Sequence, residues 1–311
     1  MSLNYSRKEL TKLIKEKAYK LGFSAVGIAK AESISHDSIY FKNWINNGFH
    51  ADMAYLNNHY DKRINPELLV PGTKSIICVA LNYFPKTFIP EDEYQISWYA
   101  YGKDYHIIMK DKLKQLFDYI SEIQTTEGRL FCDTAPVLER YWAWKAGLGW
   151  IGKNTQLIIP KAGSTFFLGE LFIDIDLEYD TPQENRCGKC TKCLEACPTK
   201  ALTSPYILNS NRCLSYLTIE NRNDIPEKYI EKMNNKIYGC DDCLKVCPWT
   251  RFAKPTMIEE FNASTALLEM NKSQWNNLKL EEYQILFKKS AVKRAKFNGL
   301  TRNIEAAKLN D

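Results

Sequence analysis

The sequence predicts an α+β fold: a mixed α/β domain over residues 1–180, a cysteine-rich domain over 181–255 and a helical, basic segment over 256–311. Three observations support it. Helix-type and strand-type apolar patterns intermingle in the first part, eight of the ten cysteines fall within residues 187–247, and the last part is polar with a helical pattern. A composition of 45% hydrophobic and 25% charged residues is ordinary for a globular protein and excludes a disordered or fibrous chain.

The α/β domain begins with a helix over residues 6–21, where apolar side chains recur at helical spacing and Gly22 provides the C-cap. A strand follows at 24–29, and the apolar run 74–83 is typical of a buried central strand. The next expected elements, in order, are helices at 38–47, 51–58 and 105–123, strands at 96–101 and 130–132, and a helix at 137–146. The last two strands, 156–160 and 165–175, are predicted to pair across a Lys-Ala-Gly turn.

The cysteine-rich domain carries two runs with a specific spacing. Cys187-x2-Cys190-x2-Cys193-x3-Cys197-Pro is the run of bacterial ferredoxins. The second run, Cys240-x2-Cys243-x3-Cys247-Pro, lacks its first cysteine, which Cys213 can supply. Eight thiolates are the requirement of two 4Fe–4S clusters, so a ferredoxin-like domain is predicted.

In two-cluster ferredoxins the fourth cysteine of each run binds the other cluster. We therefore assign two ligand sets: Cys187, Cys190, Cys193 and Cys247 for one cluster, and Cys213, Cys240, Cys243 and Cys197 for the other. A pair of structural zinc sites is the alternative, although zinc sites more often show two CxxC pairs or a mixture of cysteine and histidine. Cys78 and Cys132 fall outside the pattern and are expected to be small core residues.

Asp133 is the strongest isolated acid in the first domain. It ends the expected strand at 130–132, where ligands collect in α/β sheets, and partial burial there would raise its pKa and let it donate a proton. The alternative is a helix-capping aspartate, which the sequence alone favours. The four histidines are scattered and predict no metal site. Gly147-x-Gly-x-x-Gly152 ends a helix, so it is not a dinucleotide-binding loop, and Gly147 is expected to be a helix C-cap.

Charge and hydropathy limit the partners. The net charge is 42 − 37 = +5, and residues 279–311 hold eight Lys/Arg against four acids. This basic tail suits an anionic partner or a solvated helix face. No apolar run approaches the roughly 20 residues of a membrane span, and the first residues lack the apolar core of a signal peptide. A cytoplasmic protein without a membrane partner is therefore expected.

Several longer motifs together resemble the epoxyqueuosine reductase family, a cobalamin-dependent, reductive-dehalogenase-like group that modifies tRNA. They are Asp133-Thr-Ala-Pro-Val-Leu-Glu-Arg140, Ala146-Gly-Leu-Gly-Trp-Ile-Gly-Lys-Asn154, the two cysteine runs and Arg212-Cys-Leu-Ser-Tyr-Leu-Thr-Ile-Glu220. The cysteine runs occur in many families. Their combination with residues 133–154 is specific.

The resemblance implies a nitroreductase-like cobalamin-binding domain and reduction of the epoxide of epoxyqueuosine to queuosine at the tRNA wobble position. The cobalamin would be base-off, in keeping with the lack of a DxHxxG motif. Asp133 would be the proton donor and would also face the cofactor. The other residues implied to line cobalamin are Arg63, Ser97, Arg140, Lys153, Leu157, Leu168, Ser215, Asp241 and Asp242. The residues implied to face tRNA are Asn221, Arg222, Arg294 and Arg302.

The partners expected on this basis are a tRNA with epoxyqueuosine in its anticodon loop and a low-potential electron donor of unknown identity, with the protein a monomer. Two alternatives remain open. One is a different corrinoid iron–sulfur reductase, such as a dehalogenase of small molecules. The other is a plain iron–sulfur electron carrier, which the 180-residue domain in front of the clusters disfavours.

Overall fold

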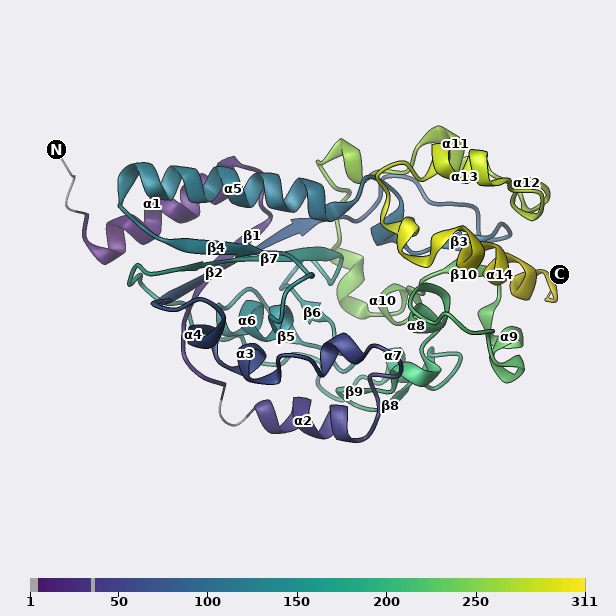
Figure 1. Ribbon diagram of the computed structural model, residues 1–311, viewed down its shortest axis with the longest axis horizontal. Helices are drawn as coiled ribbons and strands as arrows, with labels where there is room; N and C mark the ends of the chain where they lie inside the picture. The colour runs from purple at the N-terminus through teal and green to yellow at the C-terminus, as the bar shows by residue number, and fades with distance from the viewer. Residues whose placement is uncertain (1–4, 35–36, 311) are drawn as a thin grey trace.

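A four-stranded antiparallel sheet organises the first half of the computed structural model, which describes residues 5–34 and 37–310 (Figure 1). The strand order is β1-β2-β7-β4, and every neighbouring pair is antiparallel. The strands are β1 (Ala25–Lys30), β2 (Ser75–Asn82), β7 (Phe166–Ile173) and β4 (Gly128–Phe131). All but the last residue of β2 are buried, which confirms the predicted central strand.

Helices cover both faces of this sheet. On one face lie α1 (Arg7–Lys20) and α5 (Tyr105–Ile123), and on the other lies α6 (Glu139–Lys145) (Figure 1). Helix α1 starts with a capping box in which the side chain of Ser6 accepts the N–H of Glu9. Helix α5 occupies the predicted range and is capped by Asp104, whose carboxylate accepts the N–H of His106. Gly147 follows α6 with φ +76, as expected of a C-cap glycine.

Four local expectations were wrong. Residues 96–101 form only the end of β3 (Gln95–Ile96) and a 3₁₀ turn, and 51–58 holds only a 3₁₀ turn at Ala54–Leu56. The helix expected at 137–146 begins at Glu139, because Leu138 has a non-helical backbone. The strands expected to form a hairpin do not pair: β6 (Leu157–Ile158) pairs with β5 (Trp150–Ile151), whereas β7 lies between β2 and β4.

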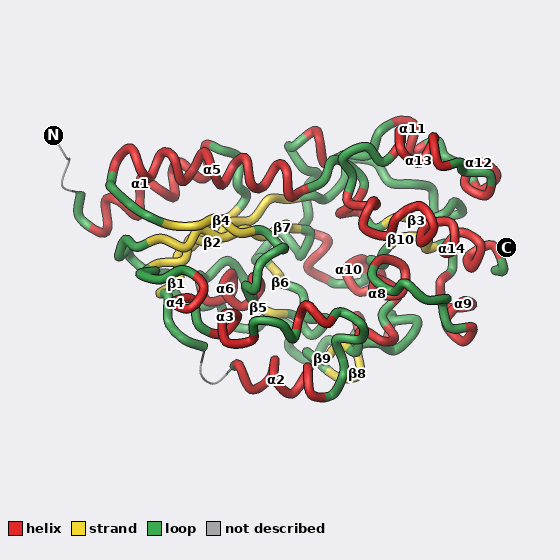
Figure 2. The backbone as a smooth tube through the Cα atoms, in the orientation of Figure 1, coloured by secondary structure: helices red, strands yellow, loops and turns green. Residues whose placement is uncertain are grey.

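The second half consists of short elements joined by long loops (Figure 2). Strand β3 pairs in parallel with β10 (Lys236–Tyr238) and so links residues far apart in the chain. The remaining elements are α2 (Ser38–Asn46), α3 (Tyr60–Ile64), α4 (Pro66–Leu69), α7 (Lys192–Glu195), β8 (Leu202–Ser204), β9 (Ile207–Leu208), α8 (Leu214–Ile219), α9 (Glu227–Met233), β10 (Lys236–Tyr238), α10 (Asp242–Lys245), α11 (Thr265–Leu268), α12 (Lys272–Asn276), α13 (Leu280–Leu286) and α14 (Lys296–Lys308).

One hydrophobic cluster joins the two halves. It runs from Leu10 in α1, through Leu113 in α5 and Leu217 in α8, to Ala307 in α14. A second cluster fills the space between the sheet and α6 and includes Trp142. The division into three domains stays a prediction, but the parts share this core. No helix within the described residues is long and apolar enough to cross a membrane.

Candidate active site and cluster domain

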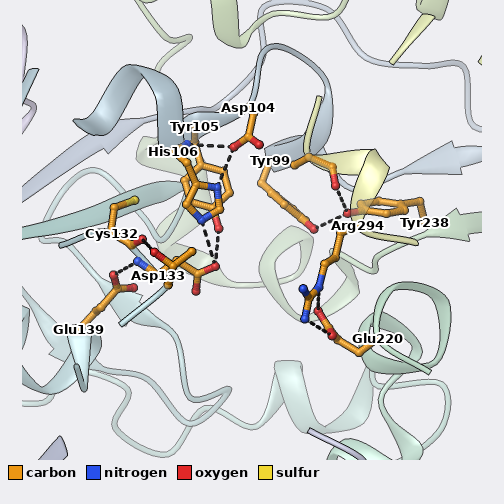
Figure 3. A network of polar contacts seen from close by, with 12 residues as sticks. Tyr99, Asp104, Tyr105, His106, Cys132, Asp133, Glu139, Glu220, Tyr238 and Arg294 are labelled. Carbon is orange, nitrogen blue, oxygen red and sulfur yellow. Dashed lines mark hydrogen bonds and ion pairs between the residues drawn. The ribbon is translucent and has the colours of Figure 1, made fainter. Parts of the chain in front are cut away.

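Asp133 lies directly beyond β4, on a loop with unusual backbone geometry. Its φ is +58, a left-handed value that aspartate tolerates better than most residues. Its side chain is 58% exposed, and its Oδ2 accepts a hydrogen bond of 2.9 Å from the hydroxyl of Tyr105. The same Oδ2 lies 3.4 Å from Nε2 of His106 (Figure 3). The carboxylate is therefore fixed by the first turn of α5 and remains open to solvent.

His106 lies between two carboxylates. Its Nδ1 is 2.7 Å from Oδ1 of Asp104, and its Nε2 faces Asp133 (Figure 3). Burial alone would lower the pKa of His106, but the contacts with Asp104 and Asp133 favour the charged ring and raise the pKa to about 9. The imidazole therefore carries a proton at neutral pH.

The expected rise in the Asp133 pKa is wrong. The contact with His106 lowers the pKa of Asp133, and the Tyr105 hydroxyl and the charge of Arg140 lower it further, although burial acts in the opposite direction. The predicted placement at a carboxyl edge also needs correction. The sheet is antiparallel, so its strands share no such edge, and Asp133 instead follows the end of edge strand β4. At neutral pH the Asp133 carboxylate is therefore charged.

Two further acids lie behind Asp133. Glu139, at the start of α6, accepts the backbone N–H of Asp133 through Oε1. Burial, together with the charge of Asp133, raises the pKa of Glu139 to about 7. Glu170, in β7, is completely buried, and within the described residues neither of its oxygens has a hydrogen-bond partner. Burial raises the Glu170 pKa well above its ordinary value, and Glu139 and Asp133 add to the shift. Neither Glu139 nor Glu170 was predicted from the sequence. Glu170 has a visible signal, because it is the single acid in an otherwise apolar strand.

Replacing Glu170 with methionine should stabilise the fold by about 1–3 kcal/mol near pH 8, because it removes a buried polar group without a partner. Since the folded protein holds the Glu170 proton to a higher pH than the unfolded chain does, wild-type stability falls as the pH rises above about 4.5. The gain should therefore be small near pH 5 and grow toward pH 8. Thermal unfolding under anaerobic conditions at both pH values measures it.

Leu171→Met is the matched control, since Leu171 is equally buried on the same strand but packs in the other cluster. It should change stability by a similar amount at both pH values. A Glu170→Met protein that is less stable than wild type near pH 8 would contradict the argument.

The seven cysteines of the two runs and Cys213 are all partly exposed and free of disulfides, whereas Cys78 and Cys132 are buried. Burial is the main cause that raises the pKa of the Cys193 thiol, and the nearby thiols of Cys247 and Cys187 raise it further. Burial likewise raises the pKa of the Cys247 thiol, and the nearby thiols of Cys187 and Cys190 raise it further. These four thiols therefore lie together, as the proposed cross-ligation requires.

The other four cysteines form a second group. The pKa of Cys243 is raised by burial and then by the thiols of Cys240, Cys213 and Cys197. Cys197 also accepts the N–H of Ala201 at 3.2 Å, a bond that suits a ligating sulfur. Within the described residues, no three His, Cys, Asp or Glu side chains are arranged to hold a single metal ion. Each group of four thiols matches the ligand number of one 4Fe–4S cluster.

The loop after β5 connects the sheet domain to both cysteine runs. Lys153 donates to the carbonyls of Gly188 (2.7 Å) and Cys190 (2.9 Å) in the first run. Asn154 donates to the carbonyl of Cys243 (3.3 Å) in the second. This loop therefore lies between α6 and the cluster domain.

The other residues predicted to line a cofactor come from several segments. Arg140 donates to the carbonyl of Thr155 at 2.7 Å, which brings it to the loop just described. Ser97 is buried beside Asp241, whose carboxylate accepts the N–H of Trp98 at 2.8 Å. Arg63 is buried and donates to the carbonyls of Tyr55 and Asn58. Asp242 forms an ion pair with Lys236 at 3.1 Å. The remaining three are buried Leu157 in β6, half-buried Leu168 in β7 and half-buried Ser215 in α8.

Comparison with known proteins identifies the family. Residues 63–134 match the family model "Epoxyqueuosine reductase QueG, DUF1730", and residues 186–250 match the "4Fe-4S double cluster binding domain". An epoxyqueuosine reductase of Leadbetterella byssophila is 47% identical over 97% of this chain and 99% of its own. The chain belongs to the epoxyqueuosine reductase family. An epoxyqueuosine reductase of Cellulophaga algicola is 45% identical over 95% of this chain and 97% of its own.

Solved epoxyqueuosine reductases have the same fold. One, crystallised with an epoxyqueuosine-modified tRNA-Tyr stem loop, is 28% identical, with a TM-score of 0.91 over 98% of this chain and 82% of its own. Another, from Bacillus subtilis, has its catalytic aspartate loop swung out of the active site; it is 27% identical with the same TM-score. A catabolic reductive dehalogenase shares the fold alone, with 16% identity and a TM-score of 0.51. The predictions of the family, the fold class, an oxidoreductase and a double cluster domain are confirmed.

The four residues predicted to face tRNA all make side-chain hydrogen bonds within the protein. Arg294 forms a two-point pair with Glu220, at 2.8 and 2.7 Å, and in Figure 3 the pair lies across from Asp133. Arg222 donates to the carbonyls of Ile219, Arg294 and Ala295. Arg302 donates to the carbonyls of Leu217, Asn221 and Asn223. Asn221 is buried and donates to the carbonyls of Asn223 and Asp224. These arginine side chains therefore already have hydrogen-bond partners within the protein.

Proposed function

We propose that this chain reduces the epoxide of epoxyqueuosine to the alkene of queuosine in a tRNA anticodon, using cobalamin supplied with electrons by two 4Fe–4S clusters. The observation that carries the proposal is the likeness, over nearly the whole chain, to epoxyqueuosine reductases, one of them solved with a modified stem loop. The proposal also includes a low-potential electron donor and a cytoplasmic, monomeric enzyme.

The residues present fit a cobalamin. A corrin ring is an apolar macrocycle edged with neutral amides, so it needs apolar contacts and polar groups at its periphery. Half-buried Leu168 offers the first, and Arg140, Lys153 and Ser215 offer the second. The loop that contains Lys153 and Asn154 lies between the sheet domain and both cysteine runs, which is where an electron acceptor for the clusters belongs. Cobalamin, when bound, supplies a low-valent cobalt that passes electrons to the epoxide carbon.

Asp133 is proposed as the group that delivers a proton to the epoxide oxygen. An alkoxide is a poor leaving group, so protonation of this oxygen lets the C–O bond break and the hydroxyl finally leave as water. The exposure of the Asp133 side chain allows it to meet a bound nucleoside. Tyr105 and His106 hold the carboxylate in place from α5. The target base must leave its stack to reach this loop.

The direct test is anaerobic incubation of the protein with cobalamin, a low-potential reductant and an epoxyqueuosine-bearing anticodon stem loop, with nucleosides analysed by mass. The expected result is a product that lacks one oxygen atom, formed only when cobalamin is present. Visible spectra should show corrinoid bands in addition to cluster absorption. A protein that holds cobalamin but leaves the nucleoside unchanged would favour the small-molecule reductase, and one that binds no corrin would favour the electron carrier.

Neutralising Arg294 should weaken binding of the stem loop and reduce the slope of log affinity against log salt by about 1, because one phosphate contact is lost. Arg294→Gln suits this test, since the Arg294 side chain is 54% exposed at the rim of the site. Affinity measured over a series of salt concentrations gives the slope. Lys308→Gln, which removes an equally exposed charge from α14, should leave the slope closer to that of the wild type. An unchanged slope for Arg294→Gln would show that Arg294 serves only to hold Glu220.

A further inference from the structure

The proposed reaction needs more protons than Asp133 can hold. Conversion of an epoxide to an alkene and water takes two electrons and two protons. The electrons come from the external reductant through the clusters. Contacts with His106 and Tyr105 lower the pKa of Asp133, so at neutral pH its carboxylate carries no proton of its own. Another group must therefore supply the proton that Asp133 delivers.

The geometry around His106 suits it for this task. Its Nε2 lies 3.4 Å from Oδ2 of Asp133 and is buried, and within the described residues it has no hydrogen-bond partner of standard geometry. A small closure would form a hydrogen bond, as is common when a substrate enters an active site. Its Nδ1 is held by Asp104 at 2.7 Å, and the ring stacks on Tyr105 with the centroids 4.2 Å apart. The ring is thus fixed with one nitrogen directed at Asp133.

We propose that His106, held by Asp104, stores the proton that Asp133 delivers to the substrate; this inference rests on the proposed function. The proton on Nε2 moves to Oδ2 of Asp133 and leaves a neutral imidazole. Asp133 passes it to the epoxide oxygen as the C–O bond breaks. The ring regains a proton from solvent, and a second passage protonates the hydroxyl, which leaves as water. His106 acts only through Asp133, so it is a positioning and proton-storing residue.

Other charged groups around His106 and Asp133 influence the pKa values of these two residues. Asp104 and Asp133 both favour the charged imidazole, and burial opposes them. The charge of Arg140, on α6, lowers the pKa of Asp133, and the charge of Lys110, on α5, lowers the pKa of Asp104. Glu139 accepts the N–H of Asp133 from behind. These neighbours balance in favour of a protonated ring, with a pKa of about 9.

The first test is the pH dependence of a single turnover. Wild-type protein should keep its rate up to about pH 9 and lose it above, where His106 becomes neutral. His106→Gln should be slower by about 10–100-fold near pH 7. It should recover toward pH 5, where Asp133 can take its proton from solvent, or on addition of imidazole buffer. Tyr105→Phe is the matched control, because it removes the other hydrogen bond to the same oxygen but keeps the ring. It should retain the high-pH limit of the wild type.

The second test does not depend on turnover. Nitrogen NMR of histidine-labelled holoprotein, with the His106 signal assigned by its loss in His106→Gln, should show a ring that stays protonated up to about pH 9. Asp104→Asn should lower that pKa, because the ring loses one of its two carboxylates. A His106 that titrates near its ordinary value, about 6.5, would overturn the inference. So would a His106→Gln protein with the wild-type pH profile.

These outcomes separate the inference from the proposed function. If wild-type protein fails to form queuosine while His106 titrates as expected, the proposed function is wrong, and the raised pKa of His106 stands without a substrate to receive its proton. If queuosine forms and His106→Gln behaves like wild type, the function stands and the proton store is wrong. Iron content and corrinoid bands of each variant show whether it is folded and loaded.

Discussion

Replacement of Asp133 with asparagine should slow epoxide reduction at neutral pH by about 10²–10⁴-fold, the usual contribution of a general acid. Asparagine has almost the same shape and can still accept the hydroxyl of Tyr105, but it cannot carry a proton from His106 to the substrate. Single-turnover assays read by nucleoside mass measure the rate. Corrinoid bands and affinity for the stem loop should stay at wild-type levels, because the loop keeps its backbone bond to Glu139.

Asp118→Asn is the matched control for this experiment. Asp118 is an exposed aspartate on α5 whose ion pair, among the described residues, is with Lys114 one turn away, so its loss should leave the rate unchanged. An Asp133→Asn protein that reduces the epoxide at the wild-type rate would remove Asp133 from the proposed chemistry. The proton store at His106 would then have no route to the substrate.

Replacement of Cys213 with alanine should remove one of the two clusters and lower the iron content from about eight to about four atoms per chain. The second run provides Cys240 and Cys243 for this cluster, and Cys197 comes from the first run. Cys213, at the start of α8, is the fourth thiol of that group. Iron analysis and electron paramagnetic resonance of the reduced, anaerobic protein measure the loss.

Two further variants make this result interpretable. Cys78→Ala removes a buried thiol in β2, far from both groups in sequence, and should retain all the iron. Cys247→Ala should also lose about half the iron, but its remaining resonance signal should be the one that Cys213→Ala lacks. Full iron in Cys213→Ala would refute the ligand sets, as would identical residual signals in Cys213→Ala and Cys247→Ala.

Local sequence signals predicted part of this fold well. Helix α5 has its predicted bounds, because its apolar stripe and its capping aspartate lie within a single segment. The cysteine runs predict a double cluster domain for the same reason. The partners of β7 were missed, because the turn at 161–163 imitates a hairpin, while the paired residues of β2 and β4 lie 84–98 and 39–45 positions earlier in the chain. Pairings at such distances leave no mark on the local pattern.

The site shows the same division between local and distant information. The position of Asp133 after a strand was visible in the sequence, but its charge state depends on Tyr105 and His106, which belong to a different element. Arg302 was predicted to meet tRNA because it is basic and lies in a basic segment. In the structure its guanidinium is occupied by backbone carbonyls, which no charge pattern can reveal.

Asn303 connects α14 to two segments of the cluster domain. Its buried amide donates to the carbonyl of Thr218 in α8 at 2.7 Å and to that of Ile237 in β10 at 2.8 Å. The first of these segments follows Cys213 and the second leads into Cys240, so the last helix clamps together two ligand-bearing stretches. During synthesis, the ribosome must release α14 before this clamp can close. Maturation of the second iron site should therefore wait until α14 has left the ribosome, while the sheet can form much earlier.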